Sequence, residues 1–179
     1  MIIKTFEQWV CRRNDLEGAR QILHGEPAAL LDYCAVGDGK YELFTILNPA
    51  GREVGLAGLY EIDRANGTAC VDAQVCSDEE KTQLTKALFW LMYHAFEHLG
   101  LEKVYLKRPD SLEENKKMGY WGYLGFVREG VLREQGKRGK KRYDVVYYGM
   151  LKRDFVRCQM TDRLLRDHFQ LADETQAGV

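Results

Sequence analysis

The sequence predicts an α+β fold (mixed α/β), with a largely antiparallel central sheet flanked by helices. Three observations lead to this prediction. Strand-like segments separated by turn signals fill residues 41–76, apolar residues recur every three or four positions over residues 78–99, and two β-rich segments close the region 122–151. These patterns are typical of a strand meander, an amphipathic helix and a hairpin, respectively.

The first forty residues predict a short strand and two helices. Apolar side chains within residues 1–10 favour the strand. Asn14 and Asp15 are suitable residues to cap a helix over residues 16–24, because their side chains can accept hydrogen bonds from its free N–H groups. Pro27 then suits the first turn of a second helix, which extends to about residue 33.

The meander follows a glycine-containing loop. Asn48 opens a tight turn after its first strand, and the pair Asn66-Gly67 is the strongest hairpin signal in the chain. Gly55 and Gly58 lie inside the middle strand and indicate a bulge or a close backbone approach. The three strands are expected at residues 41–47, 54–62 and 68–76.

The second half of the chain changes period. A helix is expected over residues 78–99, and Gly100 suits the position just after its end. The closing hairpin turns at two glycines, and its second strand is apolar on both faces, which places it inside the sheet. The remaining expected elements are a strand at 103–107, a short helix to about residue 123, and a last helix at 153–171. We therefore expect one domain at residues 1–152, followed by a C-terminal helix and tail at 153–179.

Composition excludes several classes of protein. The 179 residues carry a net charge of −1, which does not favour a nucleic-acid partner or an anionic membrane surface. The chain has no apolar run near the roughly 20 residues that span a bilayer and no signal-peptide pattern at its start. Its five cysteines lack CxxC spacing, so they favour reduced thiols in a cytoplasmic protein.

Four segments resemble the GNAT superfamily of N-acetyltransferases, in particular the branch that acetylates ribosomal-protein N-termini. One pair is quite specific in combination, namely Tyr123-Leu-Gly-Phe-Val-Arg-Glu-Gly and Asp144-Val-Val-Tyr-Tyr-Gly-Met-Leu. The resemblance covers about residues 55–155 and implies the GNAT fold, with a V-shaped pair of parallel strands. The four segments are residues 59–69, 94–104, 123–133 and 144–151.

The resemblance also implies a donor site. In the family an acetyl-CoA or other acyl-CoA thioester lies in the V, here between residues 68–76 and 103–107. Backbone amides of a glycine-rich loop at the start of the long helix hold its pyrophosphate, since free N–H groups and the positive helix end favour an anion. The residues at matching positions are Gln74, Val75, Cys76, Lys81, Thr82 and Gln83.

The sequence departs from the family at that loop. It has no glycine between Gly67 and Gly100. Ser77 and Glu80 instead have the spacing of a capping box, and residues 78–80 are all acidic. Each like-charge contact with a phosphate would cost on the order of several kcal/mol. A pantetheine arm without strong pyrophosphate recognition, such as that of a carrier protein, is therefore an alternative acyl donor.

Two catalytic roles are expected. Asp72 lies mid-strand and is either the general base or the partner of a basic group. In many family members a tyrosine at the position of Trp121 acts as the acid that protonates the leaving thiolate. Because Trp121 cannot do this, a neighbour, Tyr120 or Tyr123, is the candidate acid. The alternative is that this aromatic cluster only caps the sheet. The family's Glu position is Cys70, which is read as a small packing residue like Cys76.

Two functions remain open at this point. The first is an N-acyltransferase that moves an acyl group to a small-molecule or peptide amine. The second is a catalytically silent binding or regulatory member of the fold that has lost ordinary CoA binding and binds a partner or small molecule. A carrier or partner protein and a homodimer are possible associations. The basic segment 133–142 could bind an acidic partner, a nucleic-acid backbone or a CoA phosphate, but a solvated hairpin tip is the favoured interpretation. His94 and His98 are expected on a solvated helix face rather than at a metal.

Overall fold

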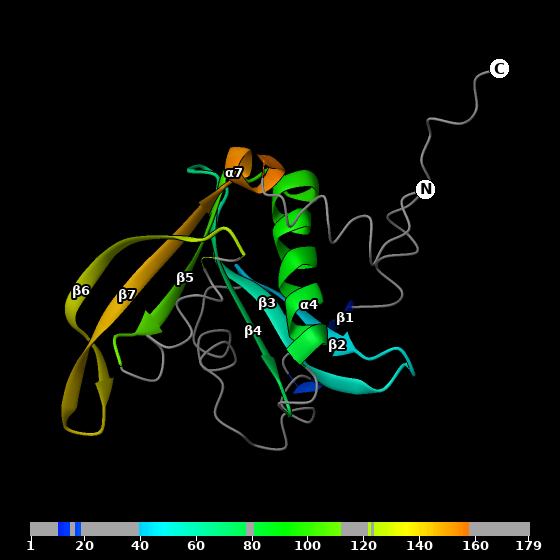
Figure 1. Cartoon of the computed structure of the whole chain (residues 1–179), viewed down its shortest axis with the longest axis horizontal. Coiled ribbons are helices and arrows are strands. Elements are labelled where there is room, and N and C mark those ends of the chain that lie inside the picture. Colours follow the sequence, from blue (N-terminus) through cyan, green and yellow to red (C-terminus); the bar gives the residue numbers. More distant parts are fainter. Residues whose placement is uncertain are drawn as a thin grey trace.

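The computed structural model describes residues 11–14, 17–18, 40–77, 81–111, 122 and 124–157. Within this part of the chain a twisted sheet packs one face against a single long helix (Figure 1). The strands are β1 (Cys11–Asn14), β2 (Glu42–Leu47), β3 (Glu53–Asp63), β4 (Thr68–Val75), β5 (Lys103–Pro109), β6 (Val127–Arg138) and β7 (Lys141–Leu151). The helices are α4 (Lys81–Tyr93), the π-turn η2 (His94–His98) and α7 (Lys152–Arg157).

The described strands form one sheet in the order β1-β2-β3-β4-β5-β7-β6. All neighbouring strands are antiparallel except β4 and β5, which are parallel. β7 lies between β5 and β6, as its apolar sequence predicts. The predicted α+β class and largely antiparallel sheet are therefore confirmed.

The parallel pair is short and then opens. Three residue pairs join the strands, and the last of them is Cys70 with Tyr105. Beyond it β4 continues to Val75 and β5 to Pro109 without pairing to each other, and the two strands diverge in Figure 1. This divergence is the V-shaped parallel pair that the family resemblance implies.

Local chemistry explains the turn and the close approach in the meander. The Oδ1 atom of Asn48 accepts hydrogen bonds from the N–H groups of Ala50 and Arg52, at 3.1 and 3.0 Å, which closes the predicted turn. At Gly55 an added Cβ would lie only 2.2 Å from the carbonyl oxygen of Gln74. The glycine is thus required because the neighbouring strand approaches too closely for a side chain.

The core lies between the sheet and α4. The helix is described from Lys81 and ends in the π-turn, close to the predicted end at residue 99. Gly100, with φ +66°, then reverses the chain as predicted. The main buried contributors from the sheet are Leu59, Ala69, Val71, Val104, Leu106, Val146 and Met150, and those from the helix are Ala87, Leu88, Leu91, Met92, Ala95 and Phe96.

One expectation near the N-terminus changes. Asn14 was expected to cap a helix, but it belongs to β1 and pairs with Leu43, because β2 offers Cys11–Asn14 an edge to extend. The predicted strand within residues 1–10, the second helix, the short helix before residue 123 and the chain after Arg157 lie outside the described residues. The separate C-terminal helix and tail stay a prediction. Where the chain is described, no helix is long and apolar enough to cross a membrane.

Candidate active site

Polar side chains gather on the sheet face that α4 does not cover. Directly paired residues of neighbouring strands share a face, so Tyr60, Cys70 and Tyr105 lie side by side across β3, β4 and β5. Cys70 and Tyr105 form the last pair before the V opens. A row of potential proton donors therefore lies at the narrow end of the V.

An ion pair spans the V just beyond that point. Nη2 of Arg108 on β5 donates to Oδ1 of Asp72 on β4 at 2.7 Å, and the two side chains are only 15% and 16% exposed. The same oxygen of Asp72 accepts the N–H of Ala73 at 2.9 Å. Burial lowers the pKa of Arg108, but the charge and hydrogen bond of Asp72 outweigh it, so the pKa lies above its ordinary value. Asp72 was expected to be either a general base or the partner of a basic group, and the structure shows Arg108 as that basic group.

A second carboxylate, Glu61, lies over the same face. It sits in the irregular end of β3 with φ +50°, a conformation that is uncommon for a residue with a side chain. Its carboxylate accepts a 2.6 Å hydrogen bond from the Tyr105 hydroxyl and binds the Lys107 ammonium at 2.5 Å. These contacts join β3 to β5 across the intervening strand. Backbone strain of this kind often accompanies functional sites.

Two tyrosine rings surround the ammonium of Lys107. Tyr105 and Tyr147 are stacked with their centroids 5.9 Å apart, and the Lys107 nitrogen is 5.7 and 5.6 Å from the two centroids. Burial lowers the pKa of Lys107, but Glu61 reverses the effect and leaves it above the ordinary value. Burial and the hydrogen bond to Glu61 raise the pKa of Tyr105. Lys107 is therefore a fixed cation and Tyr105 a neutral hydroxyl at physiological pH.

The two cysteines of this region differ sharply. Cys70 is fully buried, and burial raises its pKa to about 12, although a hydrogen bond with Tyr60 acts in the opposite direction. Burial also raises the pKa of Tyr60. Cys76, just past the end of β4, is exposed, so its expected role as a packing residue is wrong. Cys70 is thus a neutral, packed thiol, as expected, but it packs on the face opposite α4.

The residues predicted to bind the cofactor divide into three groups. Val75 packs against the core, and Gln83 is 9% exposed. Gln74, Cys76 and Thr82 are exposed near the open end of the V and the start of α4. The side chain of Lys81, and all of Tyr120 and Tyr123, lie outside the described residues, so their proposed roles stay predictions.

His94 departs from the expected solvated position. Its Nε2 atom contacts Oε2 of Glu42 at 2.7 Å, and each side chain is 14% exposed. Its ring stacks on Trp90 at 5.1 Å. The π-turn places the imidazole between α4 and β2, where it links the helix to the sheet. Among the described residues no group of three or more His, Cys, Asp or Glu side chains could hold a metal ion.

Sequence reasoning missed five residues of this site. The alternation in residues 103–107 could have placed two of them on one face, since every second residue of a strand points the same way. The contact of Arg108 with Asp72 had no sequence signal, because it forms only where the strands diverge. The missed residues are Glu61, Tyr105, Lys107, Arg108 and Tyr147.

Comparison with known proteins agrees with this architecture. The spermidine/spermine N-acetyltransferase SpeG of Vibrio cholerae, in complex with manganese ions, has a TM-score of 0.66, 21% identity, and coverage of 85% of this chain and 97% of that chain. A dodecameric structure of the Vibrio cholerae spermidine N-acetyltransferase gives 0.65 and 21%, with 84% and 97% covered. The chain has the GNAT fold. This is the fold that the resemblance to the GNAT superfamily implies.

Sequence comparison gives a weaker match of the same kind. "Putative ribosomal N-acetyltransferase YdaF" of Bacillus subtilis (strain 168) is 28% identical over 106 residues, which are 59% of this chain and 57% of that protein. The matched part thus spans little more than half of this relative. No family model matches the chain.

The GNAT fold implies an acyl-CoA donor, and the chain fits one part of that molecule. Beyond Cys70 and Tyr105 the facing edges of β4 and β5 do not pair with each other, so their backbone groups there could form hydrogen bonds with a pantetheine arm. For the pyrophosphate part the sequence offers no glycine from residue 68 to 99 through which phosphates could approach backbone N–H groups, and residues 78–80 lie outside the described part of the chain. The fit therefore supports a pantetheine thioester more than the whole of CoA.

Proposed function

We propose that the protein is an N-acyltransferase that moves an acetyl or other acyl group from a pantetheine thioester to an amine. One observation carries the proposal. The parallel strands separate after Cys70 and Tyr105, and Asp72 lies at the opening, on the face that α4 leaves uncovered. A thioester placed in this opening would have a carboxylate beside its carbonyl carbon.

The chain's own residues supply the proton transfers in this proposal. The neutral amine attacks the thioester carbonyl, and a backbone N–H of β4 stabilises the developing oxyanion. Asp72 receives the amine's proton, directly or through water, while Arg108 holds the carboxylate in place. The C–S bond then breaks, and Tyr120 or Tyr123 protonates the leaving thiolate. The products are an amide and a free thiol.

The acceptor is a small-molecule or peptide amine. Relatives named for polyamine and ribosomal substrates support this class. The dodecamer reported for the Vibrio cholerae enzyme supports self-association, of which a homodimer is the simplest form. The cysteine usage supports a cytoplasmic location.

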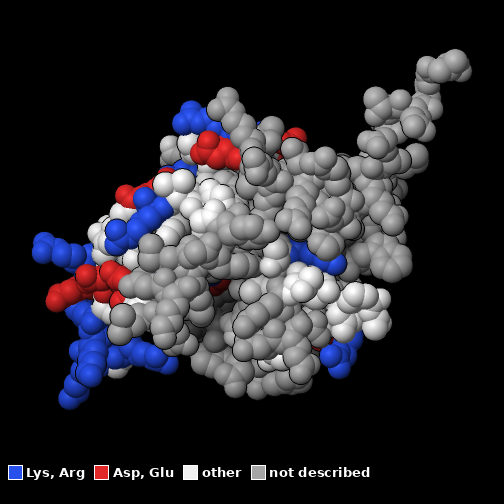
Figure 2. All heavy atoms as spheres, in the orientation of Figure 1, with Lys and Arg blue, Asp and Glu red and all other residues white. Residues whose placement is uncertain are grey.

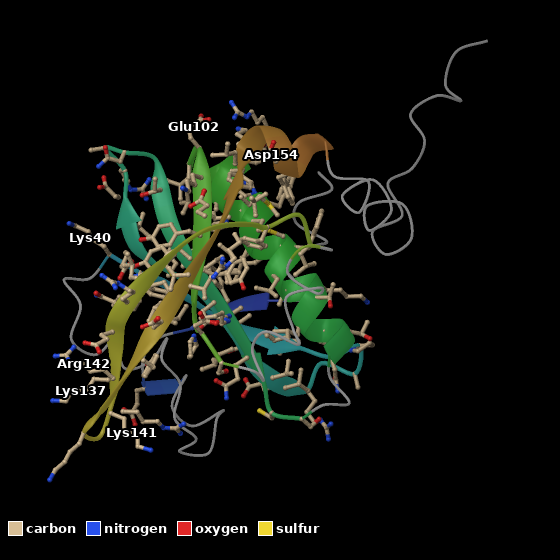
Figure 3. The ribbon with its side chains drawn as sticks, turned by 60° about the vertical axis from the view of Figure 1, so that its left-hand side comes forward. Lys40, Glu102, Lys137, Lys141, Arg142 and Asp154 are labelled. Atoms are coloured by element: carbon tan, nitrogen blue, oxygen red, sulfur yellow. The ribbon has the colours of Figure 1, made fainter. Side chains whose placement is uncertain are left out.

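Release of free thiol provides the test. The protein would be given acetyl-CoA or S-acetyl-pantetheine, with spermidine or a short peptide with a free N-terminus as acceptor. We expect thiol release that requires the amine, and we expect Asp72→Asn to lower kcat/KM by roughly 10²–10⁴-fold. Asp154→Asn is the matched control, because Asp154 lies on α7, outside the polar face (Figure 3). Equal rates for Asp72→Asn and the control would exclude Asp72 as the base.

The lack of glycine at the start of α4 favours a second candidate, a catalytically silent protein that binds a partner. In that case no donor would give amine-dependent thiol release. Thiol release separates the two candidates, and thermal shift then shows whether a silent member still binds S-acetyl-pantetheine or CoA without turning it over.

A further inference from the structure

The β6–β7 hairpin continues past the rest of the sheet. The last pair between β5 and β7 is Pro109 with Val145, whereas β6 and β7 go on pairing as far as Arg138 with Lys141. Residues 133–144 therefore form a two-stranded extension, here called the basic arm, that has no neighbour on β5. Figure 1 shows it projecting from the sheet.

Charge is concentrated on this arm. The arm contains six basic and two acidic side chains, a net charge of +4. The whole chain has a net charge of −1, so the other residues together carry −5. Lys137, Lys141 and Arg142 extend from the end of the arm in Figure 3, and basic atoms gather at the same end in Figure 2. The six basic residues, all exposed, are Arg133, Lys137, Arg138, Lys140, Lys141 and Arg142.

The arm is held in a defined shape at its base. The N–H of Glu134 donates to Oδ1 of Asp144 at 2.7 Å, and Nη1 of Arg142 donates to the carbonyl oxygen of Glu134 at 3.0 Å. The ring of Tyr143 covers Gly136, where any Cβ would overlap it. Paired residues share a face, so Lys137 lies with Arg142 on one face and the next pair lies on the other. A partner can therefore meet positive charge from either side.

The arm also lies at the open end of the V. β5 runs from the narrow end at Tyr105 to Pro109, and the arm begins where β5 stops. The distance along β5 from Tyr105 to Pro109 is roughly 13 Å at the usual rise of a strand. A molecule seated on the arm would be placed to send a linear thioester chain into the V from its open end.

We propose that the basic arm docks an acidic carrier protein whose pantetheine bears the acyl group. This inference rests on the proposed acyltransferase function and names the class of its donor. Attraction between the arm and an acidic protein would replace the phosphate recognition for which the start of α4 offers no glycine. The charges lie at the rim, so their main effect is on association and on its dependence on salt.

Another explanation for the cations needs to be separated. β6 ends the sheet, and exposed lysines on such a strand prevent it from pairing with other chains. That role requires no partner. It predicts that charge reversal on the arm changes aggregation and leaves the use of every donor unchanged.

The experiment compares two donors in two charge variants. One donor is an acyl carrier protein loaded with an acetyl group on its phosphopantetheine, and the other is S-acetyl-pantetheine. The arm variant carries Lys137→Glu, Lys140→Glu and Lys141→Glu, which leaves Arg142 and its backbone contact intact. The control variant carries Arg52→Glu, Arg64→Glu and Arg153→Glu, three exposed sites outside the arm with the same change in net charge.

We expect the arm variant to raise KM for the carrier donor by roughly tenfold or more and to leave S-acetyl-pantetheine unchanged. We expect the control variant to change neither donor by more than about twofold. Binding of the fluorescently labelled carrier, followed by anisotropy without turnover, should weaken by the same factor as KM rises. Raising the salt concentration should weaken wild-type binding and have little effect on the arm variant.

Several results would overturn the inference. Equal KM values for the carrier in wild type and arm variant would do so, as would an equal rise in both variants. A 20-base-pair nucleic-acid duplex would serve as a competitor. If it displaces the labelled carrier at a lower concentration than unlabelled carrier does, the arm would be assigned to a nucleic-acid backbone instead. If S-acetyl-pantetheine gives no transfer in the wild type, the acyltransferase function fails, while anisotropy still reports whether the arm binds the carrier.

Discussion

The two faces of the central sheet differ although the same strands build both. On β5, Leu106 is fully buried against the α4 side, while its neighbour Lys107 is 26% exposed and bound to Glu61 on the other side. The α4 face is apolar, whereas the opposite face carries the carboxylates of Glu61 and Asp72 and the ammonium of Lys107. Arg108 reaches Asp72 where the strands diverge. Alternation along a strand thus separates the residues that stabilise the fold from those that could carry chemistry.

The largest expected difference lies within the polar face, between Cys70 at the narrow end of the V and Cys76 past its open end. Burial raises the pKa of Cys70 to about 12, so at pH 9 only about one Cys70 side chain in a thousand is a thiolate. We expect iodoacetamide at pH 9 to label Cys76 and to leave Cys70 unlabelled in the native protein. Peptide mass spectrometry reads both sites, and denaturation should make them equally reactive. Rapid labelling of Cys70 in the native protein would show that the reagent reaches the polar face at the narrow end of the V.

The next largest effect tests the apolar face. Leu106→Ala removes a fully buried side chain beneath α4 and should lower the free energy of unfolding by about 2–5 kcal/mol, through lost transfer energy and a cavity. Urea unfolding followed by circular dichroism measures the change. The comparison variant is Lys107→Met, which keeps the aliphatic stem between the tyrosine rings and should cost less than about 1.5 kcal/mol. Equal losses would mean that the two faces contribute alike to stability.

Much of the fold is predictable because its signals are local. The Asn48 turn, Gly100 after the helix and the alternation in β4 each depend on a few neighbouring residues, and the structure contains all three. The strand Cys11–Asn14 is different. Its state depends on pairing with β2, which is distant in sequence, so the capping role predicted for Asn14 was wrong, although residues 17–18 are helical as predicted.

The site is less predictable because it is assembled across strands. Asp72 was found from a carboxylate in a strand, but its partner Arg108 reaches it only because β4 and β5 diverge. Glu61 has no motif, and its position depends on an irregular strand end with positive φ. His94 was misplaced because helical spacing alone does not show that Glu42 of β2 faces it. In each case the missing information is a long-range contact.

The last expected effect concerns the ion pair that spans the V. Arg108→Met leaves the Asp72 carboxylate in a largely buried position without the guanidinium, and we expect a loss of about 2–3 kcal/mol at pH 7. This value is below that of a fully buried pair because both side chains keep some exposure to water. Asp72→Asn should cost a similar amount, since it removes the negative charge next to a buried cation.

The double variant Asp72→Asn with Arg108→Met decides whether the pair acts as a unit. Removing both charges avoids an uncompensated buried charge, so the double variant should be more stable than the sum of the single losses predicts, by about 1–2 kcal/mol. Urea unfolding of all four proteins completes the cycle. Strictly additive losses would show that the two groups do not stabilise each other. In that case Asp72 would owe its position to the Ala73 N–H and the surrounding strands rather than to Arg108.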